Sequence, residues 1–157
     1  MSDTTFSAKE RIRCSRIMSQ KVVSVRAKST IQDAALILRE SDIGILPVTD
    51  AEGTLVGVLT DRDIVVRAVA EGLDVKNTTV GDIMTRELFT AAPDDFVFKA
   101  IRTMGEKQVR RIPIVDSEGK IAGMLSMADI ALEMEDEREI AEALEEISSG
   151  AAFWSKK

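Results

Sequence analysis

The sequence predicts an α/β (α+β) fold in which two β-α-β-β-α units pack with pseudo-two-fold symmetry, with helical extensions at both ends of the chain. Three observations lead to this prediction. The 157-residue chain repeats its own pattern without a gap, and its short apolar runs alternate with segments of helical period. Its composition, 45% hydrophobic and 31% charged residues, is typical of a soluble globular protein.

The repeat consists of matching residues 66 positions apart, such as Pro47 and Pro113. Other identical pairs include Ile17/Ile83, Met18/Met84, Ala34/Ala100, Asp50/Asp116, Gly53/Gly119, Gly57/Gly123, Leu59/Leu125, Asp63/Asp129 and Ile64/Ile130. A unit of roughly 50 residues buries too little surface to be stable alone, so we expect two copies to share one core. The resulting division is an N-terminal extension (1–14), a first repeat (15–72), a linker (73–80), a second repeat (81–134) and an acidic C-terminal helix and tail (135–157).

The first repeat begins with a predicted strand over residues 22–27. A helix follows over residues 30–41, capped by Ser29 or Thr30, because its apolar residues recur at helical spacing. Residues 45–50 and 54–60 predict two strands joined by a turn. A second helix is expected over residues 61–72, with Gly72 as its C-terminal stop.

The second repeat predicts the same order of elements. Residues 88–92 take the place of the first strand, and the Pro93-Asp94-Asp95 run starts a helix over residues 95–107. Strands follow over 111–116 and 120–126, and a helix over 127–137. Because proline cannot donate a ladder hydrogen bond, Pro47 and Pro113 are expected at strand starts or edges.

The residue types that are missing exclude several kinds of chemistry. The chain has no histidine, no tyrosine and a single cysteine. A Ser–His or Cys–His nucleophile, a His-containing zinc site and an intrachain disulfide therefore cannot form. We expect no catalytic residues and no metal ligands. Cys14, which lies near Arg13 and Arg16, is more readily explained as a lone cysteine in an N-terminal helix than as a reactive thiol.

The charge and the hydropathy pattern narrow the expected partners and location. The net charge is −6, and an acidic surface disfavours general nucleic-acid binding. No apolar run approaches the roughly 18 residues that cross a bilayer, and the first residues lack the apolar segment of a signal peptide. We therefore expect a cytoplasmic protein with no membrane partner.

The motif GVLTDRDI (57–64) and its copy GMLSMADI (123–130) allow two interpretations. Thr60 with Asp63, and Ser126 with Asp129, fit the capping box that closes the free amides at a helix start. The same carboxylates could instead accept the 2′- and 3′-hydroxyls of a ribose. Glutamate or glutamine is the better capping partner because its side chain is longer, so aspartate in both copies favours the second interpretation.

On these residues the sequence resembles a tandem pair of cystathionine β-synthase (CBS) domains, known as a Bateman module, of the stand-alone type. The Ile-Met segments at Ile17-Met18 and Ile83-Met84, the run LPVTDAEGTLVGVLTDRD and its copy IPIVDSEGKIAGMLSMAD carry the resemblance, over about residues 15–132. It implies a regulatory, non-catalytic module that senses AMP, ADP, ATP or S-adenosylmethionine in two clefts between the repeats. The resemblance also implies that the module requires no cofactor and that it forms a homodimer. In such modules the hydroxyl and aspartate of the motif face the phosphate and ribose, which here are Thr60, Asp63, Ser126 and Asp129.

Further residues are candidates for contact with such a ligand. Arg110 and Arg111 precede the second apolar-proline pair and have the fork geometry that suits phosphate, whereas Gly44 and Ile45 precede the first. The two clefts are therefore expected to differ, and Arg62 is another candidate for phosphate contact. Apolar cover for adenine is expected from Val23, Leu46, Pro47, Ile112 and Pro113, although residues of this kind in strands are more often core. The alternative function is a dimeric scaffold or interaction module that binds no nucleotide.

Overall fold

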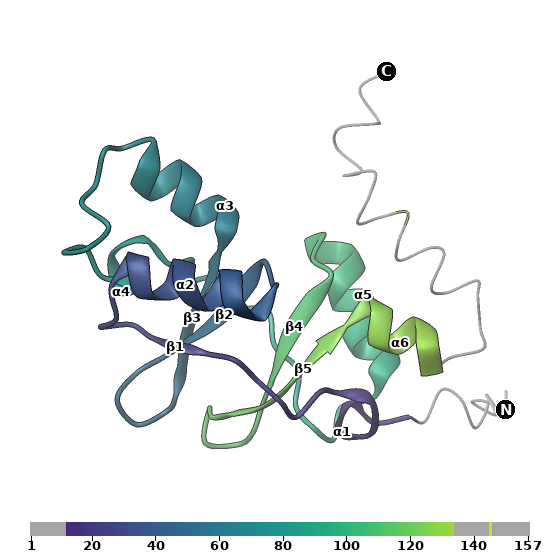
Figure 1. Cartoon of the computed structure of the whole chain (residues 1–157). Coiled ribbons are helices and arrows are strands. Elements are labelled where there is room, and N and C mark those ends of the chain that lie inside the picture. Colours follow the sequence, from purple (N-terminus) through teal and green to yellow (C-terminus); the bar gives the residue numbers. More distant parts are fainter. Residues whose placement is uncertain (1–11, 134–144, 146–157) are drawn as a thin grey trace, which may run out of the picture. The chain divides into compact units, whose positions relative to one another are not determined.

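A computed structural model describes residues 12–133 and residue 145 (Figure 1). The chain forms two compact units that do not coincide with the sequence repeats. One, here called the first-repeat unit, contains residues 22–88 and 118–121; the other, the second-repeat unit, contains the described residues 12–21, 89–117 and 122–133. The Ile-Met segment at the start of each repeat in the sequence therefore belongs to the unit of the other repeat.

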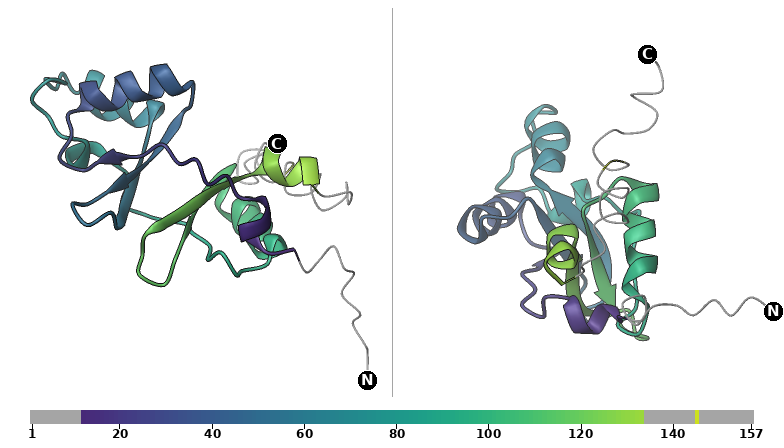
Figure 2. Two further views of the ribbon diagram at one scale, coloured as in Figure 1. Left: turned by 60° about the horizontal axis from the view of Figure 1, so that its bottom comes forward. Right: turned by 90° about the vertical axis from the view of Figure 1, so that its right-hand side faces the viewer.

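The first-repeat unit contains a three-stranded sheet in the order β1-β2-β3, in which β1 is parallel to β2 and β3 is antiparallel to it. Its elements are β1 (Val25–Arg26), α2 (Ile31–Ser41), β2 (Ile45–Thr49), β3 (Leu55–Thr60), α3 (Asp61–Asp63), the π-helix η2 (Ile64–Val69) and α4 (Val80–Ile83). Buried residues of α2, such as Ile31 and Ala34, pack with Leu46 and Leu59 of the strands in one core. Figure 2 shows these helices and strands from two further directions.

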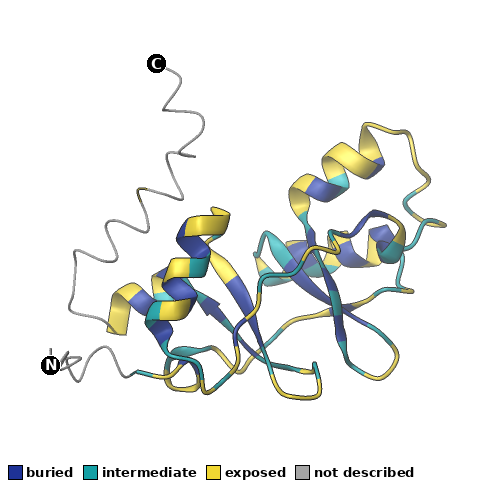
Figure 3. Cartoon of the chain, turned by 180° about the vertical axis from the view of Figure 1, so that it is seen from behind, coloured by how far each residue is buried: buried dark blue, intermediate teal, exposed yellow. Residues whose placement is uncertain are grey.

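The helix predictions for this unit are confirmed with small changes. Thr30 caps α2, and its hydroxyl accepts the Asp33 amide at 3.1 Å. The predicted helix over 61–72 begins at Asp61, continues as η2 and ends before Gly72, whose φ of 68° is the left-handed conformation expected of a C-terminal glycine. The first predicted strand is only two residues long. Figure 3 shows that the helix after β3 is largely exposed.

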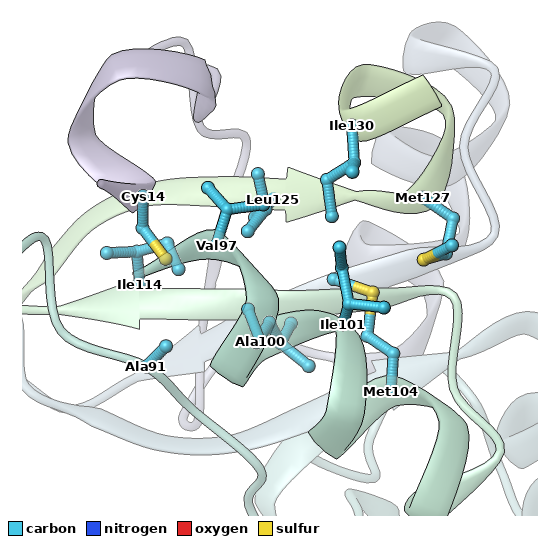
Figure 4. Packing of buried hydrophobic residues seen from close by; sticks show 11 residues of the cluster. Cys14, Ala91, Val97, Ala100, Ile101, Met104, Ile114, Leu125, Met127 and Ile130 are labelled. Carbon is cyan, nitrogen blue, oxygen red and sulfur yellow. The ribbon is translucent and has the colours of Figure 1, made fainter. Parts of the chain in front are cut away.

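The second-repeat unit is built on the two-stranded sheet of β4 (Arg111–Val115) and β5 (Ile121–Ser126). Its helices are α1 (Cys14–Ile17), α5 (Val97–Lys107) and α6 (Met127–Glu133). Figure 4 shows their shared core, in which Cys14 of α1 lies beside Val97 of α5 and Ile114 and Leu125 of the strands.

Two expectations about strands and helix starts are wrong. Residues 88–92 form no strand: Ala91 makes one parallel bridge to Ile114, and Pro93 has no N–H with which to continue the ladder. Helix α5 begins at Val97 rather than at Asp95, because the Asp95 carboxylate accepts the Ala92 amide at 2.9 Å and stabilises a turn instead.

The prolines do not mark strand starts, but Pro113 lies in an edge strand as predicted, because β4 belongs to a two-stranded sheet. Pro47 and Pro113 are each the third residue of a five-residue strand, β2 and β4. Pro47 lies in the central strand of its sheet, but β1 pairs only with Val48 and Thr49, so the missing N–H of Pro47 interrupts no pairing with β1.

The predicted terminal extensions, including the acidic helix and tail at 135–157, lie outside the described residues, apart from residues 12–14 and 145. Within the described part of the chain, no helix has the length and apolarity required to cross a membrane.

Candidate functional site

The glycine of each motif is required by close packing of the Ile-Met segment. A Cβ atom added at Gly57 would lie 2.7 Å from the Met84 sulfur and 2.8 Å from the Thr85 carbonyl oxygen. At Gly123 the corresponding atoms are Met18 Sδ at 2.7 Å and the Ser19 carbonyl oxygen at 2.8 Å. Since real Cβ atoms do not approach backbone so closely, the glycines serve the fold rather than a ligand.

Backbone pairing holds each of these segments beside the motif. Val58 and Thr85 exchange N–H···O bonds of 2.9 and 2.8 Å in the first-repeat unit. Ser19 and Met124 do the same in the second-repeat unit, at 2.8 and 2.9 Å. The 66-residue register of the sequence is therefore preserved in space.

In the first repeat, Thr60 ends β3 and caps the helix that follows. The Thr60 hydroxyl accepts the Asp63 amide at 3.0 Å, and the Asp63 carboxylate accepts the Thr60 amide at 3.0 Å. This is a complete capping box. Asp63 is one of the few buried charged residues of the described chain, with 9% of its surface exposed.

The Asp63 carboxylate has further partners. It accepts the Thr85 hydroxyl at 3.2 to 3.3 Å and lies 3.8 Å from Nε of Arg67. The Arg67 guanidinium also donates to the carbonyl oxygens of Ile83 and Met84, at 3.0 and 3.2 Å. Asp63 thus ties the start of its helix to the segment after α4.

The second repeat has the same cap with fewer contacts. The Ser126 hydroxyl accepts the Asp129 amide at 3.0 Å, and Oδ2 of Asp129 accepts the Ser126 amide at 3.3 Å. Among the described residues, Oδ1 of Asp129 has no hydrogen-bond partner. Ser126 and Asp129 are both partly exposed.

Aspartate completes the capping box in spite of its shorter side chain, so its presence in both copies does not favour ribose binding over capping. Asp63 and Asp129 both reach the amide of the capping residue, and Asp82 does the same for Thr79 at 3.1 Å. The aspartate carboxylate is long enough because the capping residue is extended, which turns its N–H toward the first helical turn: φ and ψ are −108° and 160° at Thr60 and −88° and 157° at Thr79. Capping therefore explains the spacing of the motif without any ligand.

The arginines predicted to contact phosphate lie at different places. The Met127 amide, at the start of α6, donates to the Arg110 carbonyl at 2.9 Å, so Arg110 and Arg111 adjoin the Ser126–Asp129 cap. Both side chains are exposed and have no hydrogen bond or ion pair within the described residues. In the first repeat the matching bond joins the Asp61 amide to the Gly44 carbonyl at 3.0 Å, and Arg62 is exposed in the same turn.

The apolar candidates are mostly core residues. Leu46 and Ile112 are 0% and 1% exposed, and Pro47 and Pro113 are also buried. Only Val23 is open, at 41% exposed. Their burial favours core packing for four of the five residues, and their contact with adenine stays a prediction.

A pocket in the second-repeat unit was not foreseen. It has a volume of about 520 Å³ and lies between residues 90–95 and 115–117. None of the predicted site residues lines it. Its acidic lining includes Asp94, Asp95 and Asp116, and no pattern in the sequence distinguished these residues from ordinary turn residues.

Cys14 is not an activated thiol. Burial, together with the nearby Asp95 charge, raises the pKa of Cys14 from 9.0 to about 11. Its side chain is fully buried, so near neutral pH it is a protonated core residue. No group of three or more His, Cys, Asp or Glu side chains within the described residues could hold a metal ion.

The two units share one local plan, in which a glycine-containing strand ends in a hydroxyl–carboxylate cap and packs against an Ile-Met segment. This duplicated plan defines a protein built from two tandem copies of one small α/β domain. The chain belongs to the CBS domain family, whose model matches residues 14–69 and 80–136, and the predicted tandem pair and α/β fold are confirmed.

Two proteins are similar to this chain in sequence over most of its length. The chain is 35% identical over 131 residues to the CBS domain-containing protein YhcV of Bacillus subtilis, covering 83% of this chain and 91% of YhcV. It is 37% identical over 115 residues to Hypoxic response protein 1 of Mycobacterium tuberculosis, covering 73% of this chain and 80% of that protein.

Two solved structures have a fold similar to that of this chain. A crystal structure of Hypoxic Response Protein I with two coordinated zinc ions matches with a TM-score of 0.72 and 33% identity, over 78% of this chain and 99% of that one. The CBS domain pair of MJ0100 in complex with 5′-methylthioadenosine and S-adenosyl-L-methionine matches with a TM-score of 0.68 and 30% identity, over 78% and 94%.

Proposed function

We propose that the protein is a regulatory, non-catalytic module that binds an adenosine-containing ligand at a hydroxyl–carboxylate cap. The observation that carries the proposal is that the backbone carbonyl of Arg110 meets the Ser126–Asp129 cap at the start of α6. A partly exposed carboxylate with an unoccupied oxygen can accept a ribose hydroxyl, and two arginines without partners in the described chain can bind phosphate. The MJ0100 domain pair, which holds two adenosine compounds, supports the ligand class.

Thermal unfolding in the presence of AMP, ADP, ATP and S-adenosylmethionine tests this function. A ligand at about 100 times its dissociation constant stabilises the protein by roughly 2.7 kcal/mol. Each kcal/mol raises the midpoint of a chain of this size by about 2–4 °C. A shift of several degrees with at least one compound is expected, and no shift with any of them would contradict the proposal.

The phosphate contact has its own test. Arg111→Gln removes a charge from an exposed side chain, so the fold should be preserved. We expect it to weaken AMP binding more than adenosine binding. Equal losses for the two compounds would show that the guanidinium does not bind the phosphate.

A dimeric interaction module without a nucleotide ligand is the second candidate. The π-helix η2 exposes Val65, Val66 and Val69, at 59%, 47% and 63%. Paired antiparallel with a second copy, these valines would cover each other and place Arg62 at one end near the partner's Glu71. Each charge is at the helix end that the dipole disfavours, so the opposite charge of a partner would compensate it. We propose a homodimer on this basis. The cytoplasmic location stays a prediction.

A further inference from the structure

We infer that one adenosine-type ligand binds per chain, at Asp129 of the second repeat, and that Asp63 of the first repeat is a structural clasp. The inference rests on the proposed function and specifies which of the two motif copies performs it. It follows from differences between matched positions, 66 residues apart, in two caps with the same backbone bonding.

The first difference is the occupancy of the carboxylates. Asp63 already accepts the Thr60 amide and the Thr85 hydroxyl and lies beside the Arg67 guanidinium. It is also buried, with 9% of its surface exposed. A ribose hydroxyl could bind it only by displacing Thr85, which would exchange one hydrogen bond for another and gain little.

The matched positions in the second repeat leave Asp129 open. Ser19 is the counterpart of Thr85, and within the described residues its hydroxyl makes no bond to Asp129. Glu133 is the counterpart of Arg67 and, being an acid, cannot pair with a carboxylate. Asp129 therefore retains acceptor capacity that a ribose can fill without displacing a protein group.

The second difference is the charge beside each cap. The backbone carbonyl that meets the helix start belongs to Arg110 in the second repeat and to Gly44 in the first. The first helical residue is uncharged Met127 in the second repeat, whereas in the first it is Asp61, whose carboxylate lies 3.5 Å from the position of an added Cβ at Gly44. Arg62 is the one cation of the first cap without a partner in the described chain, and Asp61 adjoins it. A phosphate at the second cap would thus have two arginines nearby in the sequence and no acid at the first helical position, whereas at the first cap Asp61 opposes the charge of Arg62.

Isothermal titration of the full chain with AMP, ATP and S-adenosylmethionine, each in turn, counts the ligands per chain. We expect one ligand per chain for any compound that binds. Asp129→Asn should weaken binding by about 10- to 100-fold, because a hydrogen bond to a charged group is lost. The matched substitution Asp63→Asn should change affinity less than about threefold while lowering the midpoint of thermal unfolding.

Thr85→Val provides a control that does not alter either carboxylate. It removes the hydroxyl that occupies Asp63 and should leave one ligand per chain with unchanged affinity. Two ligands per wild-type chain, or an equal loss of affinity in Asp63→Asn and Asp129→Asn, overturns the inference and leaves the proposed function standing. If no compound binds the wild-type chain, the proposed function fails and the inference fails with it.

Discussion

Replacing Asp63 and Asp129 one at a time with alanine should destabilise the protein to very different degrees. Asp63→Ala removes a charged acceptor from the Thr60 amide and from the Thr85 hydroxyl and leaves Arg67 without its ion pair. Since hydrogen bonds to a charged group contribute about 1.5–3 kcal/mol each and the site is buried, we expect a loss of about 3 kcal/mol.

Asp129→Ala loses one 3.3 Å bond at a partly exposed cap. Loss of a capping side chain typically costs about 1 kcal/mol. For a chain of this size, about 2–4 °C per kcal/mol gives a midpoint fall of about 6–12 °C for Asp63→Ala and about 2–4 °C for Asp129→Ala. Thermal unfolding followed by circular dichroism, without ligand, measures the midpoints of both variants.

A double-mutant cycle isolates the clasp from the cap. Asp63→Ala combined with Thr85→Val should be less destabilised than the sum of the two single variants by about 1–2 kcal/mol, as residues that share a bond usually are. The matched pair Asp129→Ala with Ser19→Ala should be additive, because no bond joins these residues in the described chain. Equal destabilisation by the two aspartate variants, or additivity in the first cycle, would refute the assignment of Asp63 as a clasp.

Three further predictions concern the fold and the assembly. Gly57→Ala should lower the unfolding free energy by about 1–3 kcal/mol, because its Cβ would meet the Thr85 carbonyl at 2.8 Å, whereas Gly44→Ala, whose nearest atom is 3.5 Å away, should be nearly neutral in urea titrations. Cys14 has a folded pKa of about 11, above its ordinary 9.0, so the stability it contributes is complete below pH 9 and is lost as the pH rises through 11. Between pH 9 and pH 11 the unfolding free energy of the wild type should therefore fall by about 2–3 kcal/mol more than that of Cys14→Ala. Parallel profiles of unfolding free energy against pH would contradict this. Val65→Lys/Val69→Lys should convert a dimer into a monomer in light scattering after gel filtration, while Gln32→Lys/Leu36→Lys on α2 should not; a dimer that survives the valine substitutions places the interface elsewhere.

The fold could be predicted because its signals are periodic and occur twice. Thr30, Gly72 and the apolar stripe of α2 each specify a local structure that the rest of the unit does not override. The errors occur where a side chain bonds a backbone group outside its own helix. Asp95 stabilises a turn and delays the start of α5, an interaction that residue spacing does not reveal.

The candidate site was predictable in its residue types but not in its partners. The motif located Thr60, Asp63, Ser126 and Asp129, but no pattern in the residues indicated that the Thr85 hydroxyl would donate to one of the aspartates. Thr85 follows an Ile-Met segment that the sequence repeat assigns to the other half of the chain, whereas in space it lies in the first-repeat unit. Contacts of this kind depend on which segments pair, and one sequence does not specify that pairing.

The comparison of the two motif copies separates what the fold needs from what it does not need. Both copies keep the glycine, the adjoining methionine, the capping hydroxyl and the aspartate, and in both copies the glycine contacts and the two cap hydrogen bonds are the same. The fold therefore accounts for the glycine and the aspartate of the motif. Where the copies differ at the cap itself, as at Gly44 and Arg110, the same backbone hydrogen bond forms beside either residue, so the cap does not dictate the choice. Any function specific to one repeat must reside in these differing positions, and in the second repeat they place two arginines beside a carboxylate that retains a free oxygen within the described chain.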